Sequence, residues 1–137
     1  MKKITTLFAL ILLVFGFSGC TKEAGEGGTS IIKGKVYIQN YNASGTSITS
    51  EYFAQEVDVY IIYGDESNFY NDRIRTSYDG SFEFPYLEKG NYRVFVYSQC
   101  FNTVDNPCPS GLEEIIVPVT ISKNKSTVDI GTITIKE

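Results

Sequence analysis

The sequence predicts an all-β domain of about seven antiparallel strands folded into a β-sandwich. Apolar and polar residues alternate with a period of two in a series of short runs, and these runs are rich in β-branched and aromatic residues. Turn-forming Gly, Asp and Asn residues separate the runs. From residue 31 onward no apolar pattern follows the helical period, so we expect strands throughout the domain.

The predicted strands follow one another along the chain from residue 31. The first alternates from Ile32 to Ile38, and a weaker, charged strand is predicted over residues 70–78. The other runs cover residues 57–63, 82–84, 92–97, 115–121 and 128–135. In each run one set of alternate residues is apolar and should face the core.

Two residues make specific predictions about strand geometry. Pro118 has no N–H to donate to a neighbouring strand, so its strand should lie at a sheet edge. In the last strand the apolar alternation changes parity at Gly131, and a β-bulge there would return both halves to one face. The four apolar residues concerned are Val128, Ile130, Ile133 and Ile135.

Residues 1–19 have the three parts of a secretory signal peptide. Lys2 and Lys3 give a positive start, an uncharged apolar run follows, and small residues precede Cys20. The apolar run is shorter than the roughly 20 residues that a membrane-spanning helix needs. We therefore expect cleavage before Cys20.

The tetrapeptide Phe17-Ser18-Gly19-Cys20 resembles the lipobox of bacterial lipoproteins. The resemblance implies that Cys20 carries the lipid and anchors the protein to a membrane. Residues 20–30 are Gly-rich and polar, which is typical of a flexible tether, and residues 31–137 would form the sandwich. The charged start of the tether resembles the export signal of surface lipoproteins. We expect a lipid-anchored protein of the bacterial outer membrane, surface-exposed, with a periplasm-facing orientation or simple secretion as alternatives.

Composition excludes several classes of function. The chain has no histidine and a formal net charge of −4, which rises in magnitude when the signal peptide is removed. The lack of histidine removes Ser-His-Asp and Cys-His catalysis and the commonest zinc ligand. The acidic balance disfavours nucleic acid as a partner. Loop carboxylates such as Asp65, Glu66, Asp72 and Asp79 lack the spacing of a calcium loop, so we expect no metal. Because the chain has no histidine and so small a sandwich offers no deep cleft, we also expect no cofactor and no enzymatic activity.

The cysteine count favours one disulfide. Of the three cysteines, Cys20 is assigned to the lipid, which leaves Cys100 and Cys108 as a pair in an oxidising compartment. The polar, Pro-containing segment between them is typical of a loop. Free thiols or a reactive pair are the alternatives, although the spacing differs from the CxxC of redox enzymes.

Residues 77–96 resemble the carboxypeptidase regulatory-like, transthyretin-like domains that are related to the Cna-B repeats of bacterial surface proteins. The family pattern D-G-x-F-x-F-x-x-L-x-x-G-x-Y-x-V-x-V is filled by Asp79, Gly80, Phe82, Phe84, Leu87, Gly90, Tyr92, Val94 and Val96. The resemblance implies a prealbumin-like, Ig-like sandwich that serves as an accessory domain without catalytic groups. The Lys-Asn crosslink of some Cna-B domains is not expected, because the family's glutamate is missing and the last strand offers Asp129 in place of asparagine.

An aromatic row should lie on the strand faces that point away from the core. Its candidate binding residues are Tyr37, Tyr60, Phe95 and Tyr97, with Ile62 and Ile116 beside them. Exposed aromatic side chains can stack on sugars or anchor a protein partner. The alternative is that residues 41–56, which contain several aromatic residues, fold over this face and bury it.

These observations predict a non-enzymatic, lipid-anchored module that binds or scaffolds at the bacterial cell envelope. One alternative is a glycan-binding accessory of a polysaccharide uptake system, which the tyrosine content favours. Another is a structural subunit of an envelope or adhesive assembly. The expected partners are therefore the membrane, through the lipid, and an envelope protein or a glycan.

We predict that the substitution Cys20→Ser releases the mature protein from membranes. Two or more acyl chains on Cys20 would contribute about 0.8 kcal/mol for each buried methylene, which is sufficient for stable anchoring. Partition between detergent and water, compared for the two proteins, measures the effect. Equal membrane association of the Cys20→Ser protein would contradict the lipid assignment.

Overall fold

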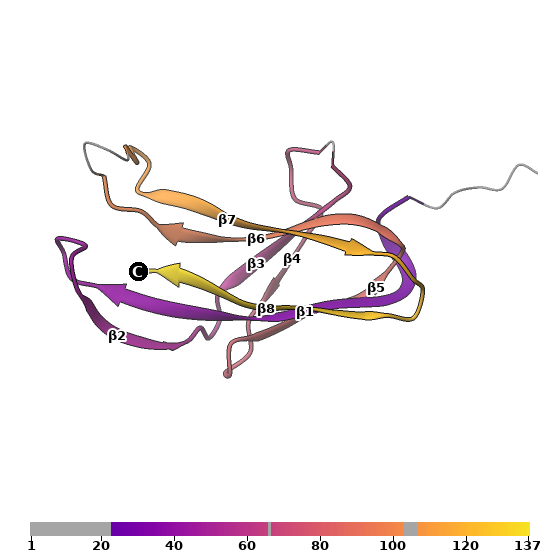
Figure 1. Ribbon diagram of the computed structural model, residues 1–137, viewed down its shortest axis with the longest axis horizontal. Helices are drawn as coiled ribbons and strands as arrows, with labels where there is room; N and C mark the ends of the chain where they lie inside the picture. Colours follow the sequence, from indigo (N-terminus) through magenta and orange to yellow (C-terminus); the bar gives the residue numbers. More distant parts are fainter. Residues whose placement is uncertain (1–22, 66, 103–106) are drawn as a thin grey trace, which may run out of the picture.

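The computed structural model describes residues 23–65, 67–102 and 107–137. The predicted signal peptide, Cys20 and Glu66 therefore lie outside the described residues. Within them the chain is all-β, with eight strands in two packed sheets, as predicted for a β-sandwich (Figure 1). None of the described residues forms a helix long and apolar enough to pass through a membrane.

Sheet A is organised around the sixteen-residue strand β1 (Glu26–Tyr41). On one edge β1 pairs in parallel with β8 (Thr127–Lys136). On the other edge it pairs antiparallel with β5 (Ser81–Leu87) along its first part and with β2 (Ile48–Phe53) along its last part. A single long strand thus holds all the other strands of this sheet.

Sheet B is antiparallel throughout and packs on the inner side of sheet A. Its strand order is β4 (Asp72–Arg75), β3 (Asp58–Tyr63), β6 (Gly90–Gln99) and β7 (Leu112–Ile121). Strand β7 is an edge strand, which confirms the position predicted for Pro118.

The core lies between the two sheets and contains the residues that the alternation assigned to it. Ile32, Val36, Val59, Val94 and Val96 are fully buried. The bulge predicted in β8 is also confirmed, because Gly131 has a φ of 75° and the β1–β8 register shifts beside it. As a result, the apolar residues on both sides of Gly131 pack against the same core: Val128, Ile130, Ile133 and Ile135.

Three features differ from the sequence prediction. The structure has eight strands in place of about seven, because β2, whose six residues are all exposed, forms an additional edge strand. The pairing of β1 with β8 is parallel, whereas an antiparallel sandwich was predicted. Strand β1 also begins at Glu26, inside the segment predicted as a tether.

The buried Tyr92 explains why the ordered chain begins early. Its side chain is 1% exposed, and its hydroxyl donates to the carbonyl oxygen of Glu88 at 2.7 Å. The backbone N–H of Gly25 donates to the same hydroxyl oxygen at 3.0 Å. Because these groups are part-buried, the bonds hold the residues before β1 against the β5–β6 turn. Ala24 packs against the core at the same place.

We predict that Tyr92→Phe lowers the free energy of unfolding by roughly 1–3 kcal/mol, because it removes the hydroxyl that bonds two part-buried backbone groups. Tyr63→Phe is the matched control, since the Tyr63 hydroxyl donates to the Glu26 carboxylate at an exposed position. Tyr63→Phe should lower the free energy of unfolding clearly less than Tyr92→Phe. Denaturant unfolding of both variants measures the difference, and equal losses would show that the buried hydroxyl has no special role.

Candidate functional site

The aromatic residues singled out in the sequence do not share one surface. Tyr37 lies on the outer face of sheet A, where its half-buried ring meets the ring of Phe53 edge-on at 5.2 Å between centroids. Tyr60, Phe95 and Tyr97 lie on the outer face of sheet B, on strands β3 and β6. The alternation of a strand gives the face of a residue but does not say to which sheet the strand belongs.

Residues 41–56 do not cover the aromatic residues of sheet B. After the turn that follows Tyr41, the chain reverses and adds β2 to the edge of sheet A. Of the four candidate binding residues, Tyr37 makes a ring contact with this segment, through Phe53. The outer face of sheet B thus keeps exposed aromatic surface.

Four aromatic side chains form a connected cluster on that face, which we call the aromatic platform: Tyr60, Tyr70, Phe95 and Tyr97. Tyr60 and Phe95 are stacked, with ring centroids 4.9 Å apart and planes 12° from parallel. Tyr97 meets both of these rings edge-on, each at 5.5 Å. Tyr70 meets Tyr60 edge-on at 5.0 Å. Contacts of this kind hold each ring in a defined orientation.

The platform has a buried base and an exposed upper layer. Phe95 is only 4% exposed, whereas Tyr97 is 43% and Tyr70 54% exposed. Ile116 and Leu112 on the neighbouring strand β7 are 45% and 52% exposed and extend the apolar surface. Of the predicted binding residues in sheet B, Tyr97 and the half-buried Tyr60 can therefore contact a ligand, while Phe95 mainly supports them.

The loop between β3 and β4 supplies Tyr70, which the sequence interpretation did not include in the site. Asn71 fixes this loop to β3, since its side-chain oxygen accepts from the N–H of Tyr63 at 2.8 Å and its N–H donates to Ile61. The guanidinium of Arg93 donates to the backbone carbonyl of Ser67 in the same loop. The sequence feature that could have indicated this part of the site is the pair of aromatic residues Phe69 and Tyr70 in an otherwise polar loop.

Charged side chains border the platform. Next to β3, Arg73 and Arg75 both bond the Asp58 carboxylate at 3.2 Å, and Arg75 also bonds Glu56 at 3.4 Å. On the other side, the Tyr97 hydroxyl donates to Glu114 at 3.3 Å. Desolvation, followed by the negative charge of Glu114, raises the pKa of Tyr97. The Tyr97 hydroxyl therefore stays protonated and serves as a donor at neutral pH.

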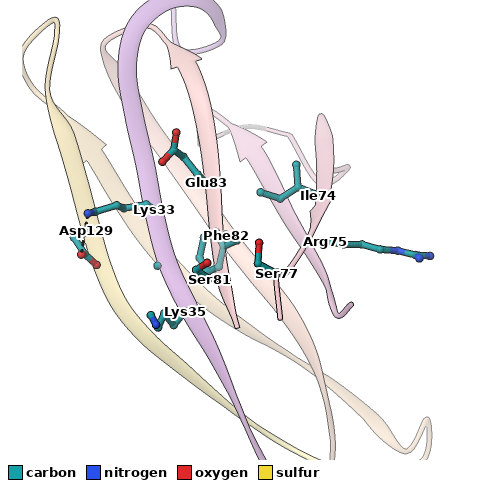
Figure 2. Close-up of a pocket in the computed structure, with 10 residues that line it drawn as sticks. Lys33, Lys35, Ile74, Arg75, Ser77, Ser81, Phe82, Glu83 and Asp129 are labelled. Carbon is teal, nitrogen blue, oxygen red and sulfur yellow. Dashed lines mark ion pairs between the residues drawn. The ribbon is translucent and has the colours of Figure 1, made fainter. Parts of the chain in front are cut away.

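A second candidate is an open depression of about 430 Å³ lined by β1, β5 and β8 of sheet A and by β4 of sheet B, which Figure 2 shows. Its charged groups are largely satisfied by one another, since Lys33 lies 3.8 Å from Asp129 and Lys35 lies 3.0 Å from Asp79. Hydrogen bonds from Ser81, then from Lys35, lower the pKa of Asp79 to about 2. Strand β1 carries Lys33 between Glu83 on β5 and Asp129 on β8.

The structure joins Cys100 and Cys108 through a disulfide, the pair expected from the cysteine count. The bond closes the loop between β6 and β7, whose residues 103–106 are outside the described chain. Phe101 of this loop contacts the ring of Tyr41 at 5.6 Å between centroids. The disulfide thus supports the contact between this loop and the end of β1.

In the described part of the chain, no three Cys, Asp or Glu side chains lie close enough to hold a metal ion.

No protein-family model matches the chain, and no curated protein sequence matches it. Among solved structures it is similar to the crystal structure of a candidate carbohydrate binding protein from Pseudomonas aeruginosa. The match has 13% identity and a TM-score of 0.46, covering 83% of this chain and 92% of that chain. A likeness this distant says nothing about the ligand of this chain.

We predict different stability effects for the two layers of the platform. Phe95→Ala should lower the free energy of unfolding by roughly 3–5 kcal/mol, because it truncates a buried ring. Tyr97→Ala should cost less, roughly 1–3 kcal/mol, because it removes two edge-on ring contacts of a side chain that is 43% exposed. Thermal and denaturant unfolding curves measure both. A loss for Tyr97→Ala as large as that for Phe95→Ala would mean that Tyr97 is part of the core and not a free binding surface.

Proposed function

We propose that this protein is a non-enzymatic, lipid-anchored binding module of the bacterial cell envelope, and that its ligand contacts the aromatic platform. The observation that carries this proposal is the exposed layer formed by Tyr70 and Tyr97 above the stacked pair of Tyr60 and Phe95. Exposed, contiguous aromatic surface on a small domain is typical of a binding site. Its rings are already ordered by their mutual contacts, which lowers the entropy cost of binding.

A glycan is the ligand that suits this surface best. The apolar face of a sugar ring can pack on tyrosine rings, and sugar hydroxyls need hydrogen-bonding groups close by. The platform provides both, because Glu114 and the Asp58–Arg73 pair lie at its borders. Aromatic stacking with bordering polar groups is a common arrangement for ligands that are apolar on one side and polar at the edge.

The resemblance to carboxypeptidase regulatory-like domains supports a module without catalytic groups. The residues that carry this resemblance have structural roles here. Asp79 and Gly80 form the turn before β5, with Gly80 at a φ of 75°, and Phe82, Phe84 and Tyr92 are buried. Within this proposal the motif of residues 79–96 specifies the β-sandwich fold, and the ligand is recognised by the aromatic platform.

The proposed anchor and the platform are compatible in space. The first described residues lie beside Gly90, so close that a Cβ atom at Gly90 would clash with Ala24. From Gly90, strand β6 runs toward the opposite end of the molecule (Figure 1). Tyr97 is seven positions further along β6, or about 23 Å at 3.3 Å per residue. A protein held to a membrane through Cys20 would therefore present Tyr97 away from the lipid.

The test is retention on immobilised glycans, with the mature protein compared with Tyr70→Ala/Tyr97→Ala. We expect the double variant to lose at least tenfold in affinity while it keeps its fold, since stacking on each ring is worth about 1 kcal/mol or more. Tyr78→Ala/Tyr86→Ala is the matched control, because these tyrosines are 84% and 72% exposed and lie outside the platform. Equal retention of all three proteins would contradict a role for the platform.

A second candidate, a structural subunit of an envelope assembly, is favoured by strand β2. Its six residues are exposed, and it lies at the edge of sheet A. An exposed edge strand can accept a further strand from a partner. Crosslinking on intact membranes would separate the two functions, because a structural subunit should give one stoichiometric protein partner and a glycan-binding module should not.

A further inference from the structure

The charges around the aromatic platform restrict the class of glycan that it can bind, an inference that rests on the function proposed above. Recognition of a carboxylate or sulfate group in a protein site normally uses an arginine or lysine that is free to pair with it. The question is therefore which cations on this face of sheet B are available to a ligand.

The arginines beside the platform are already engaged. Arg73 and Arg75 share the Asp58 carboxylate, and Arg75 also bonds Glu56. Two carboxylates thus balance the two guanidinium groups. An acidic sugar that approached them would compete with the existing carboxylate partners.

Arg93 is on the same face but points under the loop. Its guanidinium donates to the backbone carbonyl oxygens of Ser67 and Asp65, the latter at 3.5 Å. Its Nε atom is buried from solvent. In this position the guanidinium holds the loop that carries Tyr70, and a ligand that paired with its Nη2 atom would compete with the loop carbonyls.

Glu114 is the charge that remains at the exposed border. It lies opposite Tyr97 in the β6–β7 register, and its side chain accepts a hydrogen bond from the Tyr97 hydroxyl. Among the described residues no lysine or arginine forms an ion pair with it, whereas its neighbour Glu113 pairs with Lys136 at 3.7 Å. A ligand that packs on Tyr97 therefore meets a carboxylate, and the net charge of −4 adds to the repulsion of polyanions.

We infer that the platform binds glycans made of neutral or amino sugars and rejects glycans that carry uronic acid or sulfate groups. The Glu114 carboxylate can accept a hydrogen bond from a sugar hydroxyl or from a protonated amino group. The same carboxylate repels an anionic group placed on the Tyr97 ring.

The test measures the affinity of the mature protein for oligosaccharides of three kinds at low salt: laminarin (neutral), chitosan (amino sugar) and alginate (uronic acid). We expect binding to laminarin or chitosan at least tenfold tighter than to alginate. Glu114→Lys should raise the affinity for alginate on the order of tenfold, since it replaces a repelling charge with an attracting one close to the ligand. Glu51→Lys, on the β2 edge of sheet A, is the control with the same change in net charge.

The outcomes separate this inference from the proposed function. Alginate binding as tight as laminarin and chitosan binding, lost on Tyr70→Ala/Tyr97→Ala, would overturn the restriction to non-acidic glycans and support the platform as the site. Equal gains in alginate affinity for Glu114→Lys and Glu51→Lys would also overturn it, because net charge alone would then be responsible. Failure to bind any of the three glycans would count against the proposed glycan-binding function itself.

Discussion

The fold depends on the pairing along strand β1. This strand bonds β8 on one edge and β5 and β2 in succession on the other, so every strand of sheet A needs it. Its start is fixed by the buried hydroxyl of Tyr92, which connects the segment before β1 to the β5–β6 turn and hence to sheet B. One buried phenol thus joins the two sheets at the end where the described chain begins, while Ile32 and Val36 of β1 are fully buried in the core.

The candidate site is a consequence of the same alternation that builds the core. On β6, Val94 and Val96 point inward and are fully buried, while Phe95 and Tyr97 point outward to the platform. Most of the stability therefore comes from one face of sheet B and the proposed binding from the other. Exposed residues such as Tyr97 can differ between related proteins at a modest cost in stability, because the inward residues are unaffected.

The sequence could predict the core but only part of the site. Strict alternation identified most of the buried residues of β1, β3, β6 and β7, and the lack of an N–H in Pro118 placed β7 at an edge, since both are local properties of a strand. It was wrong for Ile62 and Phe95, which it assigned to the outward face and which are only 6% and 4% exposed, because other side chains of that face cover them. Alternation could not separate Tyr37 from Tyr60, because sheet membership depends on long-range pairing. Nor could it find Tyr70, whose position depends on how Asn71 fixes a loop to β3. Strand β2 was missed for a related reason: its residues are all exposed and leave no buried pattern.

The charge at the border of the platform bears on self-association as well as on the choice of ligand. Tyr70, Tyr97 and Ile116 would favour self-association if apolar contact were the only force. Glu114 lies at the border of this surface without a cationic partner among the described residues, and two copies meeting face to face would bring like charges together. Such repulsion opposes pairing of the domain with itself, while an uncharged, hydroxyl-rich ligand does not experience it. Within the proposed function, the Glu114 carboxylate would therefore both oppose self-association and select for a glycan without acidic groups.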